Sequence, residues 1–236
     1  MRAARATTAL AALLLGGGMA GSALASSPDA LRASGNEPGW VLTLTQETLT
    51  VSLADGRRIS LPAPVPDRLD DRTLRYAGEA EGKPIFVQVV DRLCRDTMTG
   101  MPHPKTVFLT LAGRPYEGCG GDPASLLAGR DWTLASLAGT PVASDGRPAS
   151  LAFTADGQVS GSSGCNRFTG RFTLTGETLS FGPLAATRMA CPEPLMQQES
   201  RLFAILAAVR GFQIAESGDL VLLTVDGPQL VARPEH

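Results

Sequence analysis

The stretch Gly-Trp-Val-Leu-Thr-Leu-Thr at residues 39–45 indicates the class of this fold. Its large side chains Trp40, Leu42 and Leu44 recur at every second position, and a period of two places them on one face of a strand. After a polar turn at Gln46-Glu47 the same period resumes through Leu49, Val51 and Leu53. We therefore expect an antiparallel hairpin with one buried face.

Similar strand signals extend over the rest of the chain, separated by Asp-Gly turn dipeptides at 55–56, 156–157 and 226–227. Residues 62–71 are rich in proline and charge, which predicts a loop. The further expected strands are 59–61, 73–77, 84–90, 106–111, 131–134, 150–154, 158–160, 167–174, 178–181, 212–215, 220–225 and 229–232.

One segment shows helical spacing instead. Pro194 suits a first helical turn, and Gly211 is the residue type expected just past a helix end, which predicts a helix over 194–210. Its apolar stripe predicts core packing, with a cost of about 3–5 kcal/mol for truncating Phe203 to Ala. The stripe consists of Leu195, Leu202, Phe203, Leu206 and Val209.

These patterns predict a mainly β (α+β) fold with two small antiparallel β-rich domains, the second having one helix packed on its sheet. The first domain is expected at residues 34–124 and the second at 129–233, with the boundary near Leu127. Residues 26–33 are expected to be a loose lead-in.

The first 25 residues have the pattern of a secretory signal peptide. Arg2 and Arg5 precede a short apolar run at 9–15, and Ala23-Leu24-Ala25 predicts cleavage after Ala25. A membrane anchor is the alternative, but this run is too short to cross about 30 Å of hydrocarbon. The expected location is the periplasm or the exterior, with no transmembrane segment in the mature chain.

Four cysteines follow the signal, and an even number in an exported chain predicts disulfides. Several pairings are possible; we favour Cys94 with Cys119 and Cys165 with Cys191, because each pair then lies within one expected domain. A four-cysteine zinc site is the alternative. It is disfavoured because the close ligand pairs of structural zinc sites are missing.

The chain carries a formal net charge of −2 and no basic cluster, which argues against nucleic acid as a partner. No cofactor motif stands out, so no cofactor or metal is expected. The Gly-Ser-Ser-Gly run at 161–164 lacks the lysine of a phosphate-binding loop.

The second half resembles the META/HslJ domain family over about residues 129–233. The resemblance is carried by Trp132, by Gly-Cys-Asn-Arg-Phe-Thr-Gly at 164–170, by Thr-Arg-Met-Ala-Cys at 187–191, and by a helix bearing Met196, Glu199 and Phe203. It implies a compact β-rich domain of bacterial envelope proteins, associated with heat stress and antibiotic tolerance and without established catalysis. The motif residues to follow are Gly164, Cys165, Asn166, Met189 and Cys191.

The first half resembles an uncharacterised envelope-protein family whose members often accompany META/HslJ domains. This resemblance is carried by residues 35–40, 94–100 and 113–120, and it implies no chemistry.

Turn chemistry accounts for the motif residues of the second half. Gly164 and Gly170 are expected at turns that need positive φ, and Asn166 is expected to cap a turn with its own side chain. A Cys165–Cys191 bond would tie this hairpin region to the start of the helix.

Catalytic candidates are few. The two histidines are His103, between two prolines, and His236, the last residue. Nucleophilic triads need such a base beside a nucleophile, and no Gly-x-Ser-x-Gly elbow occurs. Glu37, Asp91 and Asp96 are the candidate acid–base carboxylates.

Three functions follow as hypotheses. The favoured one is a non-catalytic envelope protein that binds an envelope protein or cell-wall component. The first alternative is a periplasmic inhibitor of a lytic enzyme such as lysozyme, by analogy of architecture. The second is a hydrolase using Glu37, Asp91 or Asp96.

Overall fold

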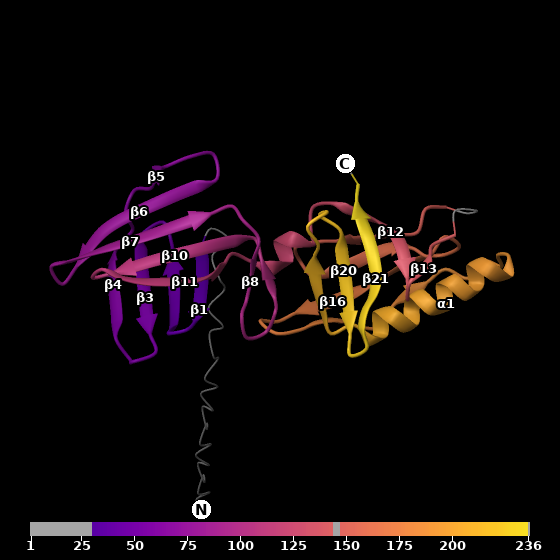
Figure 1. Cartoon of the computed structure of the whole chain (residues 1–236). Helices are drawn as coiled ribbons and strands as arrows, with labels where there is room; N and C mark the ends of the chain where they lie inside the picture. The colour runs from indigo at the N-terminus through magenta and orange to yellow at the C-terminus, as the bar shows by residue number, and fades with distance from the viewer. Residues whose placement is uncertain (1–29, 144–146, 236) are drawn as a thin grey trace, which may run out of the picture.

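The computed structural model describes residues 30–143 and 147–235, so the expected signal peptide, its cleavage site at Ala25 and His236 lie outside the described residues. Two β-sheet bodies lie side by side, with the short strand β8 between them (Figure 1). The mainly β fold class with one α-helix is confirmed for the described part of the chain.

The first body is a nine-stranded antiparallel sheet in the order β4-β3-β2-β1-β11-β10-β7-β6-β5. The strong period of two seen in 39–53 produces the hairpin β2–β3, in which Trp40 faces Leu53. The strands are β1 (Leu31–Asn36), β2 (Gly39–Leu44), β3 (Thr48–Leu53), β4 (Arg58–Pro62), β5 (Asp67–Arg68), β6 (Thr73–Ala80), β7 (Lys83–Val90), β10 (Lys105–Leu111) and β11 (Arg114–Gly120).

The expectation of a loose lead-in is wrong for residues 31–33, and residues 26–29 lie outside the described residues. Strand β1 begins at Leu31 and pairs with β2 from Leu31 opposite Leu44 to Asn36 opposite Gly39. Ala33 is buried in the core of the first body, between the side chains of neighbouring strands. The short, polar sequence of β1 conceals this strand, because its order comes from pairing with β2 and β11.

A small two-stranded ribbon, which follows β7 in the chain, contacts both the first body and the second. Strands β8 (Cys94–Arg95) and β9 (Pro102–His103) pair with each other in a sheet of their own. A 3-10 turn, η1 (Pro123–Leu126), then leads into the second body, and the side chain of Asp122 accepts the N–H of Ala124 at its start.

The second body is a ten-stranded antiparallel sheet whose main path runs β17-β16-β15-β14-β12-β21-β20-β19. Its two ends approach each other: the N–H of Leu179, the first residue of β17, donates to the carbonyl of Arg210, just before β19 (3.0 Å). The strands are β12 (Asp131–Leu137), β13 (Thr140–Pro141), β14 (Ser150–Phe153), β15 (Gln158–Ser162), β16 (Arg167–Leu174), β17 (Leu179–Phe181), β18 (Ala185–Ala186), β19 (Gly211–Ile214), β20 (Leu220–Thr224) and β21 (Gly227–Pro234).

Helix α1 (Glu193–Ala208) packs against β17 and β12. It ends two residues earlier than expected, because Val209 has extended ψ and its N–H bonds to the Leu206 carbonyl. Gly211 does not cap the helix; it is the first residue of β19. The buried helix residues are Leu195, Gln198, Leu202, Ile205 and Leu206.

Phe203 is not the centre of this packing. It is half-buried and meets the ring of Phe168 edge-on at 5.4 Å. Leu202, its neighbour, is completely buried and takes the central place. The helix is therefore a core element, as expected, but rotated slightly from the predicted stripe.

Leu127, where the boundary is predicted, is completely buried in the core of the second body. Its carbonyl accepts the indole N–H of Trp132 (2.9 Å). A cut at Leu127 would therefore damage the second body. The limits 34–124 and 129–233, and the independent folding of the two halves, stay predictions.

Candidate functional site

The family motif of the second half forms a buried turn between β15 and β16. Ser163, Gly164, Cys165 and Asn166 are all buried. The hydroxyl oxygen of Ser163 accepts the N–H groups of Cys165 (3.3 Å) and Asn166 (3.0 Å), which closes the turn. The role of Ser163 is not predicted from the sequence, because a serine in a Gly-Ser-rich run is typical of a flexible loop.

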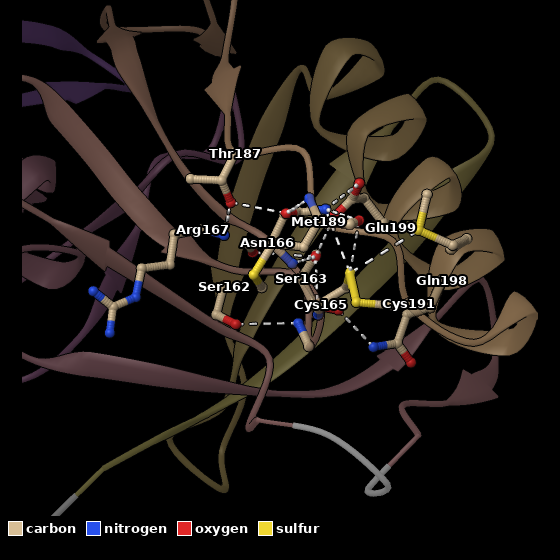
Figure 2. The surroundings of a disulfide bond; sticks show 12 residues. Ser162, Ser163, Cys165, Asn166, Arg167, Thr187, Met189, Cys191, Gln198 and Glu199 are labelled. Carbon is tan, nitrogen blue, oxygen red and sulfur yellow. Dashed lines mark hydrogen bonds between the residues drawn. A yellow bond between two sulfur atoms is a disulfide. The ribbon is translucent and has the colours of Figure 1, made fainter.

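Asn166 is the centre of this region (Figure 2), and its side chain does not cap its own turn as expected. Its Oδ1 accepts from the Thr187 hydroxyl and the Met189 N–H, each at 2.8 Å. Its Nδ2 donates to Glu199 at 3.2 Å. Asn166 thus links the 187–191 segment to α1, and each of these partners lies more than 20 residues away from it in the sequence.

Two neighbouring residues of α1 complete the network. Glu199 accepts the Ser163 hydroxyl (2.5 Å), and Gln198 donates its Nε2 to the Ser163 carbonyl (2.8 Å). The Gln198 Oε1 accepts the N–H of Ala143 (2.8 Å). Gln198 was also missed; its place three residues after Leu195, on the buried stripe, was the available signal.

A disulfide covers this network. Cys165 and Cys191 are bonded, with their Cα atoms 6.1 Å apart, and Cys191 lies just before α1. The Met196 sulfur lies 4.0 Å from the Cys165 sulfur, and Met189 is 46% exposed beside them. The other disulfide joins Cys94 to Cys119, so both bonds occur in the pairs that the sequence favoured.

The two motif glycines have different roles. Gly164 has φ of +96°, so a side chain there would be strained, as expected for a turn. Gly170 is not in a turn: it lies within β16, and a Cβ atom there would come within 2.5 Å of the Leu184 side chain. Glycine is needed at position 170 because the 183–184 segment packs closely against β16 there.

The carboxylates Glu37 and Asp96 of the first body line one crevice of about 270 Å³, together with Glu117. Asp96 is held by four hydrogen bonds: the Asn36 Nδ2 donates at 3.1 Å, the Met98 N–H at 2.9 Å, and the N–H and hydroxyl of Thr99 at 2.8 and 3.0 Å. Partial burial raises the pKa of Asp96, but these bonds outweigh it and leave the pKa below its ordinary value.

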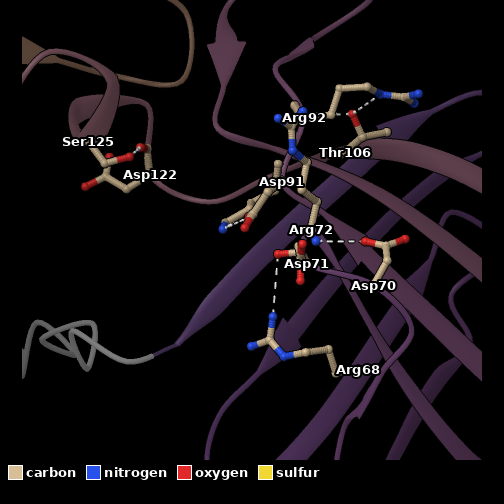
Figure 3. Close-up of polar contacts among 10 residues, drawn as sticks. Arg68, Asp70, Asp71, Arg72, Asp91, Arg92, Thr106, Asp122 and Ser125 are labelled. Atoms are coloured by element: carbon tan, nitrogen blue, oxygen red, sulfur yellow. Dashed lines mark hydrogen bonds and ion pairs between the residues drawn. The ribbon is translucent and has the colours of Figure 1, made fainter.

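Asp91 is not among the residues that line this crevice, and Figure 3 shows it next to Arg72 and Arg92. It forms an ion pair with Lys105. The Nδ1 atom of His103 is hydrogen-bonded to the carbonyl oxygen of Gly121 at 3.0 Å. The three predicted carboxylates are therefore not gathered: Glu37 and Asp96 line this crevice and Asp91 does not, whereas His103 shares a larger groove with Asp96.

A groove of about 930 Å³ runs between the two bodies. The first body contributes β1 and the 96–99 turn, and the second contributes the turn at 174–177 between β16 and β17. Arg32 lies on the first wall and Glu177 on the second, and both side chains are exposed. The three ion pairs found among the described residues include neither of them.

Within residues 30–143 and 147–235, no three His, Cys, Asp or Glu side chains are arranged to hold a metal ion. The same part of the chain contains no helix with the length and apolar character needed to cross a membrane.

Comparison with known proteins bears on the second half. The heat shock protein HslJ of Escherichia coli (strain K12) is 39% identical over 67 residues, which cover 28% of this chain and 47% of HslJ. The match thus spans about half the length of that relative.

Two NMR structures are also similar in sequence, one of them of a protein from Burkholderia xenovorans. The identities are 31% and 28%, over 48% and 46% of this chain and 86% and 92% of theirs. Their TM-scores of 0.40 and 0.39 are too low to support a statement on shared fold.

The family model of the META domain matches residues 125–236, and this range contains the buried turn, the disulfide and the helix described above. It also includes Leu127 and the last two residues of η1, which lie outside the range 129–233 expected for the second domain. The C-terminal half of this chain is a META/HslJ domain.

Proposed function

We propose that this chain is a non-catalytic envelope protein of the META/HslJ type that acts in the periplasm in stress or antibiotic tolerance. The observation that carries the proposal is the bonding of the motif. Asn166, Ser163 and Glu199 are bonded to one another beneath a disulfide, so the features that define the family maintain a shape. Two disulfides suit an oxidising compartment.

The geometry of the candidate carboxylates supports the hydrolase alternative less well than the non-catalytic proposal. A general acid or base needs free access to the proton that it transfers. Four donors occupy Asp96, and Lys105 neutralises Asp91. Of the three predicted carboxylates, Glu37 alone is then without such a bond, and the other carboxylate of its crevice is Glu117, which the hydrolase hypothesis does not include.

Binding is the mode of action that we propose, at the groove between the bodies. Arg32 and Glu177 lie on its facing walls and do not pair with each other, and the carboxylates of Asp96 and Asp122 also line it. Unpaired charges on facing walls suit a partner that carries both signs, such as an envelope protein or the peptide part of a cell-wall component.

The test is survival of cells that lack the gene, under heat and antibiotic challenge, after complementation with the full-length chain. Wild type is expected to restore survival, whereas Arg32→Glu and Glu177→Lys restore it poorly at equal protein level. Glu47→Lys, an exposed change outside the residues that line the groove, is the matched control.

Three outcomes would contradict parts of the proposal. Full rescue by both groove variants would exclude the groove as the binding surface. No effect of wild type on survival would exclude the tolerance role. Turnover of a hydrolase substrate by the purified protein would exclude the non-catalytic assignment, and stoichiometric inhibition of lysozyme would favour the inhibitor alternative.

A further inference from the structure

The β8–β9 ribbon is fixed firmly to the first body. Cys94 is bonded to Cys119 on β11, and Asn36 of β1 donates to both Asp96 and Thr97 in the ribbon's loop. The loop is closed by the Asp96 N–H, which donates to the Met101 carbonyl at 2.9 Å. The ribbon therefore presents its far side in a defined orientation.

That far side enters the second body. Met101 is 3% exposed and belongs to the hydrophobic core cluster of the second body, which also contains Leu127 and Trp132. Strand β9 lies against β19, which is part of the META range, and against η1, which overlaps the start of that range. Met98, three residues before Met101 in the same loop, is 79% exposed.

We propose that the META domain has a docking surface beside β19 and η1 for a methionine side chain, and that the disulfide-closed β8–β9 ribbon is its partner within this chain. Methionine suits such a surface, because its unbranched thioether adapts to an irregular gap. Burial of Met101 couples the two bodies, so the first body governs the stability of the second. The Cys94–Cys119 bond takes part in this coupling, because it holds the base of the ribbon.

The test is hydrogen exchange of the full-length protein, read by mass spectrometry for each segment. Met101→Ala is expected to speed amide exchange in β19 and α1 of the second body, on the order of tenfold or more, because it empties a core position. Met98→Ala is the matched control, with the same change on the same loop at an exposed position, and it is expected to leave exchange unchanged. Met101→Leu, similar in volume, is expected to restore protection.

Faster exchange confined to residues 94–103 would overturn the proposal, and so would equal effects of Met98→Ala and Met101→Ala. A second measurement needs no core substitution. With dilute hydrogen peroxide, Met98 of the wild type is expected to oxidise rapidly and Met101 slowly; equal rates would also overturn it. In the Cys94→Ala/Cys119→Ala variant, Met101 is expected to oxidise faster, and an unchanged rate would remove the disulfide from the coupling.

Discussion

Asn166 illustrates how one buried amide can organise a region of this fold. It is 1% exposed, and its side chain satisfies groups from two distant segments. A buried polar side chain is stable only when its partners are fixed, and removal of one partner leaves the others without bonds in the interior. Asn166 therefore fixes the motif turn to the 187–191 segment and to α1 through buried hydrogen bonds.

Asn166→Ala is expected to lower the free energy of unfolding of the second body by about 2–3 kcal/mol, because the N–H of Met189 and the carboxylate of Glu199 lose a buried partner. Denaturant unfolding of the full chain measures this loss. Arg167→Ala, an exposed change at the next position, is the control and is expected to fall within about 0.5 kcal/mol of wild type. Equal stability of both variants would contradict the role of the network.

Asp96 gives a pH-dependent prediction. Its pKa is lowered in the folded state, so its contribution to stability is present above its unfolded pKa of about 3.9 and is lost as pH falls through the folded value. Wild type is therefore expected to be more stable than Asp96→Asn at neutral pH, with a difference that shrinks below about pH 4. Denaturant midpoints measured across that range test this, and a difference that is constant with pH would contradict it.

At the scale of the element, α1 combines an apolar stripe with a polar edge. Leu202, Ile205 and Leu206 belong to the core of the second body, while Gln198 and Glu199 bond to the motif turn. The helix thus fixes both the core and the turn, and the Cys165–Cys191 bond holds the turn close to its first residue. Loss of the helix would disrupt both.

Leu202→Ala is expected to cost about 2–5 kcal/mol, because the side chain is completely buried and its removal leaves a cavity. Phe203→Ala is expected to cost less than the 3–5 kcal/mol of a buried aromatic, because its ring is only half-buried. Thermal melts of both variants, with the exposed change Arg201→Ala as control, rank these positions. A larger loss of stability for Phe203→Ala than for Leu202→Ala would instead support the helix orientation expected from the sequence, in which Phe203 faces the core.

At the scale of the whole molecule, the two bodies have separate sheets but share apolar packing at their junction. Met101 comes from the first body, and Leu127 follows η1, yet both lie in the second core. Two disulfides each close a loop of moderate length, with separations of 25 and 26 residues. The described residues thus form two separate main sheets, while the core of the second body includes Met101, which lies before the expected boundary.

A fragment beginning at Asp122 is expected to be more stable than one beginning at Gly129, because only the longer one retains Leu127 and η1. Loss of a completely buried leucine costs about 2–5 kcal/mol. Oxidised fragments compared by thermal melting provide the measurement. If both fragments melt at the same temperature, Leu127 contributes nothing to the second body and the boundary near it is sound.

The sequence alone determined what depends on local spacing. The period of two through Trp40, Leu42 and Leu44 fixed the β class, the Asp-Gly dipeptides located hairpins, and the stripe from Leu195 located the helix. These features could be predicted because each acts within a few residues.

Only the tertiary structure decided which distant groups meet. It gave Asn166 partners in two other segments, placed Met101 in the core of the other body, and ordered β1 by pairing at Ala33. It also separated Asp91 from Asp96, although they lie five residues apart. The physical reason is that burial and hydrogen bonding between remote segments depend on how the sheets close and pack, and no local pattern of residues encodes that arrangement.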